Sequence, residues 1–468
     1  MVFIWIFLPI VLAGNFILQK IGGNKAANIL LLLASILFYA WGEPVYVFLM
    51  IASITLNWAG GLLVEYFKPN PQSAKMVLAV VVALNLALLG FFKYAGMAVS
   101  TVNTIFKTTY ADPQIALPIG ISFFTFQALS YVVDVYRGEC QVQRNYLKLA
   151  LYVSFFPQLI AGPIVKYKDV AEQIDTRKIS IEQTASGIRR FVYGFGKKVL
   201  IANTMALAAD NIYNLGIKDM NWLLAWSASL FYTFQIYYDF SGYSDMAIGL
   251  GRMFGFEFRE NFKYPYTSTS IREFWRRWHI SLGSWFKDYV YIPLGGNRKG
   301  TARTYINLIT VFFLTGLWHG ASWSFVLWGM IHGAFSMLER SPFGKWLEKH
   351  KAFGLIYTFL VVNFAWVFFR IESIGTAWEV IERMIMPWAF ATTTANLSKI
   401  FTKKVILFFI IAIVACGPVQ RFTMEHAKKI VRKWKYSWLE IILGAIVLLY
   451  SISRLVSNTY NPFIYFRF

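Results

Sequence analysis

Residues 304–338 read TYINLITVFFLTGLWHGASWSFVLWGMIHGAFSML. This stretch divides into two apolar pieces, 304–318 and 321–338, and His319 lies at the break between them. An ionisable side chain at membrane depth is energetically expensive, so by default it marks a functional site. We therefore expect membrane-embedded helices here, with chemistry performed inside the bilayer at His319.

The whole chain has the composition of a membrane protein. Of its 468 residues, 57% are hydrophobic and 15% are charged, and the mean hydropathy is +0.50. A soluble protein usually carries about 25% charged residues. Aromatic residues make up 18%, and such rings suit a membrane interface, where one end of the side chain meets lipid and the other meets water. We predict a polytopic membrane protein.

Runs of about 20 mostly apolar residues are long enough for helices that span a bilayer. We expect an all-α protein with ten to thirteen membrane segments, near residues 2–19, 27–41, 45–66, 76–98, 116–136, 146–165, 188–208, 222–251, 304–318, 321–338, 354–371, 402–419 and 437–456. Several are too short or too long for a plain span, so we expect broken or re-entrant helices that are buried or line a cavity. We predict one membrane domain, residues 1–468, with core motifs at 117–335 and C-terminal helices and an aromatic tail at 354–468.

The net charge of +21 indicates membrane topology. Basic residues concentrate in three connections between apolar segments, at 166–190, 252–303 and 421–435. Lys and Arg stay on the cytoplasmic side and contact anionic lipid there. We predict that all three connections face the cytoplasm, with membrane lipid as a partner and no nucleic acid.

A second histidine, His279, lies in the segment 272–282. At helical spacing one face of this segment carries four side chains, Trp275, Trp278, His279 and Leu282. We therefore predict one amphipathic helix at the cytoplasmic interface. On spacing alone, the segment is either an interfacial anchor, with Trp at the headgroups and Arg on phosphates, or a functional site built around His279.

A neutral imidazole at position 319 can take a proton from a hydroxyl or thiol that attacks an acyl carbon, which is the work of a general base. Gly316 and Gly320 flank it, so helices or substrate can approach closely. The alternative is a histidine hydrogen-bonded between helices. His332 lies thirteen residues further on and, at about 100° per residue, points well away from His319, so we expect it to be structural.

Several catalytic signatures are missing from the sequence. It contains no His-x4-Asp pattern of glycerolipid acyltransferases, no G-x-S-x-G elbow, no H-E-x-x-H pattern and no Walker A loop. Its two cysteines, Cys140 and Cys416, form no CxxC pair, so we expect neither a disulfide framework nor a metal site. These absences disfavour a self-sufficient esterase, protease or ATPase.

Longer motifs accompany the two histidines. They are LPIGISFFTFQALSY at 117–131, DVYRG at 134–138, FPQLIAGP at 156–163, YDFSGYS at 238–244, FWRRWHIS at 274–281, GGNR at 295–298 and LWHGA at 317–321. With these motifs the chain resembles the membrane-bound O-acyltransferase superfamily over nearly its whole length. The similarity is to the bacterial branch that contains the alginate O-acetylation membrane protein.

The resemblance implies a ring of tilted transmembrane and re-entrant helices around a central tunnel. It implies that His319 matches the invariant histidine of the family, and that His279 matches the second histidine of the D-alanyl-transferring branch. Both are therefore candidate catalytic residues. Candidate donor-binding or tunnel-lining residues are Trp275, Arg276, Arg277, Trp278, Asp288 and Trp318. No bound cofactor or metal is expected.

The resemblance also implies a route for the acyl group. Acetyl-CoA would supply it from the cytoplasm, and it would leave on the other side of the bacterial cell membrane. A separate extracytoplasmic transferase of the SGNH type would then esterify a polysaccharide acceptor. This chain contains no such domain, so the resemblance implies a separate partner.

The leading prediction is thus a membrane O-acetyltransferase that serves an exported or cell-envelope polysaccharide. One alternative is D-alanyl transfer from a carrier protein to teichoic acid. Another, of a different class, is a transporter of polysaccharide or lipid precursors. A transporter predicts inverted repeats and paired charges at mid-membrane, and the sequence indicates neither.

The last residues, NPFIYFRF at 461–468, allow two interpretations. The first is an aromatic anchor at the membrane interface. The second rests on a resemblance to the C-terminus of the small membrane protein that accepts D-alanine in the teichoic-acid system, where a near-terminal tyrosine takes the acyl group. Tyr465 matches that tyrosine and is a candidate acyl relay.

Overall fold

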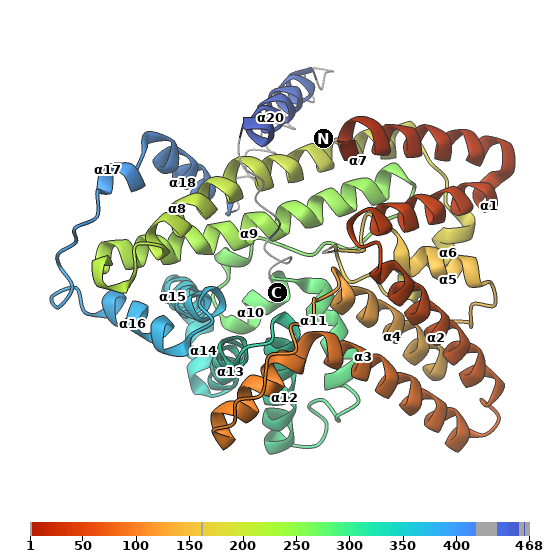
Figure 1. Ribbon diagram of the computed structural model, residues 1–468, viewed down its shortest axis with the longest axis horizontal. Coiled ribbons are helices and arrows are strands. Elements are labelled where there is room, and N and C mark those ends of the chain that lie inside the picture. Colours follow the sequence, from red (N-terminus) through yellow and green to blue (C-terminus); the bar gives the residue numbers. More distant parts are fainter. Residues whose placement is uncertain (1, 161, 418–437, 458–462, 464–468) are drawn as a thin grey trace. The chain divides into compact units, whose positions relative to one another are not determined.

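The computed structural model describes residues 2–160, 162–417 and 438–457, together with residue 463. Among these residues helices are the only regular elements, which confirms the predicted all-α architecture (Figure 1). Two predictions fall outside the described residues, namely the basic connection at 421–435 and the relay candidate Tyr465. The chain forms two compact units: unit 1 comprises Met1–Phe191 and Met246–Arg259, and unit 2 comprises Val192–Asp245 and Glu260–Phe468.

Unit 1 is built mainly from long apolar helices. Its elements are η1 (Phe3–Phe7), α1 (Leu8–Gly42), α2 (Tyr46–Tyr66), α3 (Pro71–Phe106), α4 (Ile121–Arg137), α5 (Tyr146–Ser154) and α6 (Tyr167–Thr176). Helix α1 is broken at Gly23, where φ is 65°. Its two arms fold back on each other so closely that a Cβ on Gly14 would lie 2.9 Å from Leu30 Cδ2. The spans predicted at 2–19 and 27–41 are therefore the arms of one helical hairpin.

The span predicted at 146–165 is wrong after Ser154, because α5 ends there. Pro157 and Pro163 interrupt the following segment, and proline cannot donate a helical hydrogen bond. Most of the described residues between positions 155 and 166 are nevertheless buried. Irregular backbone at membrane depth is tolerated only where protein covers it or where it lines a cavity.

Unit 2 contains both histidine segments. Helix α7 (Ile181–Gly196) enters it from unit 1, and α9 (Trp222–Met253) begins in it and ends in unit 1. Its other elements are η2 (Lys197–Ala202), α8 (Asn203–Tyr213), η3 (Ile217–Asp219), η4 (Pro265–Thr267), α10 (Ile271–Arg277), α11 (Ile280–Phe286), η5 (Lys287–Tyr291), α12 (Thr301–His319), α13 (Trp323–Leu338), α14 (Pro342–Lys349), α15 (Lys351–Arg370), α16 (Ile374–Ile385), α17 (Leu397–Ile400), α18 (Lys403–Ala415) and α20 (Trp438–Ser457).

Five helical segments among the described residues are long and apolar enough to cross a membrane, namely Phe3–Gly42, Tyr46–Tyr66, Pro71–Phe106, Lys351–Arg370 and Trp438–Ser457. Helix α13 is equally apolar but has only 16 residues. These segments confirm a multi-pass membrane protein. The other predicted segments correspond to shorter or more polar helices, so the total of ten to thirteen stays a prediction.

Candidate active site

His319 is the last residue of α12 and is 2% exposed. Aromatic rings from three helices surround its imidazole. The ring centroids of Trp318 on α12 and Trp328 on α13 lie 5.0 Å from that of His319, and Phe369 on α15 lies 5.2 Å away. The predicted helix break is confirmed, because the chain resumes helix only at Trp323. The imidazole is therefore held in a largely apolar cage deep in unit 2.

Helices α12 and α13 lie side by side because glycines occupy their contact face (Figure 1). A Cβ on Gly316 would lie 2.5 Å from the backbone oxygen of Phe325, closer than any real side chain allows. Gly329 of α13 meets the backbone of α12 in the same way, at the oxygen of Phe312. This close approach brings the Trp328 ring against His319.

The prediction of one continuous helix over 272–282 is wrong. Helix α10 ends at Arg277 and α11 begins at Ile280, with His279 between them in the left-handed region at φ 45°. Trp278 is 1% exposed and packs against Phe274 and Trp366. Burial of this ring in the core of unit 2 outweighs the local helical periodicity, so the four residues do not share one helix face.

The left-handed turn directs His279 toward Asn261 and Ser281. The backbone N–H of Ser281 donates to Asn261 Oδ1 at 3.1 Å, and its hydroxyl donates to the same oxygen at 2.9 Å. Because a backbone N–H can only donate, the amide oxygen must face this turn. His279 Nδ1 lies 3.3 Å from that oxygen, so Nδ1 carries the proton and Nε2 is the acceptor nitrogen.

Burial lowers the pKa of His279 well below its usual value. The residue is fully buried, and moving an imidazolium out of water disfavours the charged form. His279 is therefore neutral near pH 7. A neutral ring with a defined acceptor nitrogen is the form that can accept a proton.

The structure brings the two histidines together. The ring centroids of His279 and His319 are 6.4 Å apart, and Trp318 contacts both, at 5.8 Å from His279 and 5.0 Å from His319. They come from the α10–α11 break and from the end of α12. Sequence separation conceals this pairing, since the two positions are 40 apart in the chain.

His332 lies in the aromatic layer behind this pair. It is fully buried, stacks parallel to Phe274, and packs edge-on against Trp275 and Trp328. Among the described residues neither ring nitrogen has a hydrogen-bond partner. These contacts favour the structural role that its spacing predicts.

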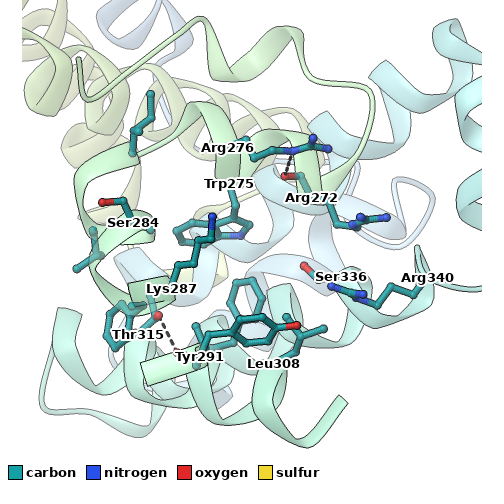
Figure 2. Close-up of a pocket in the computed structure, with 16 residues that line it drawn as sticks. Arg272, Trp275, Arg276, Ser284, Lys287, Tyr291, Leu308, Thr315, Ser336 and Arg340 are labelled. Carbon is teal, nitrogen blue, oxygen red and sulfur yellow. Dashed lines mark hydrogen bonds between the residues drawn. The ribbon is translucent and has the colours of Figure 1, made fainter. Parts of the chain in front are cut away.

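A pocket of about 490 Å³ opens beside the two histidine segments (Figure 2). Its lining combines apolar side chains of α10, α11 and α12 with four cations, Arg272, Arg276, Lys287 and Arg340. Among the described residues that line the pocket, none has a carboxylate side chain. Thr315 also lines it, one helical turn before His319 on α12, while Figure 2 shows Arg272 and Arg340 on the side away from Thr315. The pocket thus joins a cationic region to a wall that reaches within one turn of His319.

The other donor-site candidates occupy different positions. Trp275 and Arg276 line the pocket, whereas Trp278 and Trp318 are buried outside it. Arg277 donates to Glu273 at 2.6 Å and to the hydroxyl of Thr267 at 2.8 Å. Asp288 is half-buried on η5 and is not part of the pocket lining. The structure therefore brings only two of these candidates to the pocket.

Sequence reasoning missed the residues that position α10. The carboxylate of Glu339, at the end of α13, accepts the backbone N–H groups of Ile271 at 2.5 Å and Arg272 at 2.9 Å. These are unsatisfied donors at a helix N-terminus, where a negative charge is also favourable. The contact joins residues 67 or more positions apart, and no local pattern predicts it.

Two ion pairs that no local pattern predicts are also present. Lys197 donates to Asp245 at 2.6 Å, and Lys198 forms an ion pair with Asp239. Both pairs join η2 to α9 within unit 2. The pattern was missed because the partners lie more than 40 positions apart.

Elsewhere, the described residues contain no cluster of three or more His, Cys, Asp or Glu side chains that could hold a metal ion.

The neutral state of His279 predicts a pH-dependent stability. Because its pKa is lowered by folding, the unfolded chain binds a proton below pH of about 6.5 that the folded chain does not. Stability should therefore fall as pH decreases through that range, by at most about 1.4 kcal/mol per pH unit for this residue. His279→Gln, which cannot titrate, should show a shallower decline in thermal stability between pH 7.5 and 5. Parallel pH profiles of the two detergent-solubilised proteins would contradict the prediction.

Comparison with known families matches residues 76–378 to MBOAT, the membrane-bound O-acyltransferase family. The matched region contains both histidines and every residue of the pocket. It covers more than half of the chain.

Three relatives are similar to this chain over half of its length or more. The chain is 39% identical to a Pseudomonas putida protein named probable alginate O-acetylase AlgI, over 100% of this chain and 99% of that protein. It is 37% identical to a Helicobacter pylori peptidoglycan O-acetyltransferase, over 82% of this chain and 78% of that protein. It is 29% identical to a Bacillus subtilis teichoic acid D-alanyltransferase, over 50% of this chain and 61% of that protein.

Proposed function

Because this chain belongs to the membrane-bound O-acyltransferase family, and is thus a multi-pass membrane O-acyltransferase, we propose that it transfers acetyl groups to a cell-envelope or exported polysaccharide. The acetyl group comes from a cytoplasmic thioester and passes through a tunnel of the family fold to the other side of the membrane. The observation that carries the proposal is the buried pair of His319 and His279, 6.4 Å apart between ring centroids. The names of the acetylating relatives supply the acyl group and the acceptor class.

In this proposal His319 is the general base. It removes the proton from an attacking hydroxyl as the hydroxyl oxygen forms a bond to the thioester carbonyl carbon. The carbon–sulfur bond then breaks, and the departing thiolate takes up a proton. His279 holds its acceptor nitrogen, Nε2, in place through the Asn261 contact, and the neutral ring can orient the reacting groups or relay that proton.

The pocket supports a thioester donor that carries phosphates, for which acetyl-CoA is the proposed substrate. Arg and Lys side chains bind phosphate oxygens by charge-assisted hydrogen bonds, and four such cations line the pocket. Trp275 Nε1 and Ser336 Oγ have no hydrogen-bond partner among the described residues, although both atoms are buried in the pocket lining. A donor arm with amide groups and a short apolar chain would satisfy both.

Arg276→Glu should weaken donor use by about tenfold or more. It replaces a charge-assisted hydrogen bond, which is worth roughly 1.5–3 kcal/mol, with a repulsive carboxylate. The Michaelis constant for acetyl-CoA should rise with salt in the native protein, because salt screens exposed charges, and this salt dependence should flatten in the variant.

Lys299→Glu is the matched control for this prediction. Lys299 lies in the same basic connection and is exposed, but it does not line the pocket. The change in net charge is identical, so a general electrostatic effect would appear in both variants. Equal Michaelis constants for the two variants would show that the pocket does not bind the donor phosphates.

The direct test of the proposed function uses the purified protein in liposomes with acetyl-labelled acetyl-CoA. The expected result is release of the CoA thiol together with incorporation of label into the protein or an added acceptor. A D-alanyl carrier-protein thioester serves as the competing donor, because the teichoic acid relative makes D-alanyl transfer the second candidate. Preference for that donor would favour the second candidate, and no reaction with either thioester would disprove acyl transfer.

The final acceptor step is proposed to need a partner. A polysaccharide outside the membrane cannot reach a cytoplasmic thioester, so a carrier must connect them. We propose Tyr465, which lies outside the described residues, as that carrier, and an extracytoplasmic SGNH-type transferase as the enzyme that unloads it. The family match favours this scheme over a transporter of polysaccharide or lipid precursors.

A further inference from the structure

Phe463, in the C-terminal tail, makes two specific contacts in unit 2. Its ring meets that of Tyr243 on α9 edge-to-face, with centroids 4.6 Å apart and an interplanar angle of 86°. The ammonium group of Lys198 on η2 lies 4.7 Å from the centroid of the same ring. An aromatic side chain is thus held by one ring and one cation, both on helices that precede the tail by more than 200 residues.

The cation is also held by a carboxylate. Lys198 is 6% exposed and forms an ion pair with Asp239, which lies one helical turn before Tyr243 on the same face of α9. Burial and the ion pair restrict the motion of the Lys198 side chain. Its ammonium group therefore keeps a fixed position against the ring of Phe463. Cation–π attraction is strongest where both groups are shielded from water.

Helix α20 precedes the tail in the chain and packs near Lys198. It packs on the junction of α7 and η2, where a Cβ on Gly196 would lie 2.6 Å from Val447 Cγ1. Helix α20 ends at Ser457, six residues before Phe463. Six residues extend at most about 20 Å, so the docking of α20 restricts Phe463 to the neighbourhood of η2 and α9.

We propose that Lys198, Asp239 and Tyr243 form a docking site for the C-terminal tail, and that Phe463 is the positioning residue that occupies it. The inference rests on the proposed function, because Phe463 precedes the relay candidate Tyr465 by two residues. Docking limits the positions that the Tyr465 phenol can occupy. The phenol therefore reaches the donor thioester from fewer conformations. Phe463 takes no part in bond making.

Thiol cross-linking tests docking independently of acyl transfer. Cysteines replace Phe463 and Tyr243 in a chain that also carries Cys140→Ser and Cys416→Ala, and a short bifunctional thiol reagent is added to membranes. Mass spectrometry should find the two peptides linked. The control pairs Phe463→Cys with Leu223→Cys, twenty residues and about 30 Å earlier on α9, and should give no link. Equal linking of both pairs, or no linking of the first, would overturn the docking site.

Substitutions at position 463 test the positioning role. Phe463→Leu keeps an apolar side chain but removes the ring face, and it should lower acetyl loading of Tyr465 by roughly 3- to 30-fold. Phe463→Trp keeps a ring face and should restore loading. The Michaelis constant for acetyl-CoA should stay unchanged in both. Full loading in Phe463→Leu would overturn the positioning role.

The two sets of results separate this inference from the relay itself. A cross-linked tail in a chain whose Tyr465→Phe variant is fully active would retain the docking site and reject the relay. An inactive Tyr465→Phe variant without any cross-link between positions 463 and 243 would retain the relay and reject the docking site.

Discussion

His319→Ala is expected to abolish acetyl transfer while the protein still inserts into the membrane. The substitution removes the imidazole that lies inside the cage of Trp318, Trp328 and Phe369. Loss of a general base typically slows a reaction by about 10²–10⁴-fold. The substitution leaves the cage rings and the α12–α13 contact at Gly316 unchanged, so we expect the variant to fold. The measurement is the rate of thiol release from acetyl-CoA by the purified protein, with its elution profile in detergent as the check on folding.

His332→Phe is the matched control. His332 is also fully buried and also packs against Trp328, but its other ring contacts are with Phe274, Trp275 and Trp366. Phenylalanine preserves its aromatic stacking, so transfer should stay close to that of the native protein. If a well-folded His319→Ala protein still transfers acetyl groups, His319 is not the base. If His332→Phe is as inactive as His319→Ala, packing of the aromatic layer explains both losses.

The position of His319 at a helix break was readable from the sequence because its signal is local. A histidine between two apolar pieces of membrane length needs no distant partner to be noticed, and the structure places it at the end of α12 as the pattern predicts. The apolar runs at 45–66 and 354–371 likewise correspond to α2 and α15. Long apolar runs such as these two predict helices because a helix that crosses lipid must be mostly apolar along its whole length.

The environment of His279 was not readable in the same way. Periodicity over 272–282 predicts one helix, yet burial of Trp278 breaks the chain there and turns His279 toward Asn261. The same holds for Glu339 at the start of α10 and for the ion pairs between η2 and α9. Each of these contacts joins residues that are distant in the sequence, and helical spacing carries no information about such partners.

Tyr465→Phe is expected to reduce acetyl transfer to an external acceptor to background. A phenol has a pKa near 10, so it attacks a thioester only when a base removes its proton, and His319 is the proposed base. The phenolic oxygen then bonds to the acetyl carbon, the carbon–sulfur bond breaks, and the thiol leaves with a proton. Phenylalanine keeps the ring, and therefore any anchoring at the membrane interface, but it has no oxygen to acetylate.

Mass spectrometry of the C-terminal peptide makes this prediction specific. With acetyl-CoA present and no acceptor, the native chain should accumulate an acetyl group on Tyr465, because no sugar hydroxyl is present to take the group from the phenyl ester. His319→Ala should show no acetylated peptide, since the phenol lacks its base. The interfacial-anchor interpretation predicts the opposite for Tyr465→Phe, namely near-normal transfer, because the hydroxyl contributes little to anchoring. A fully active Tyr465→Phe protein would thus reject the relay and require the partner protein to receive the acetyl group directly.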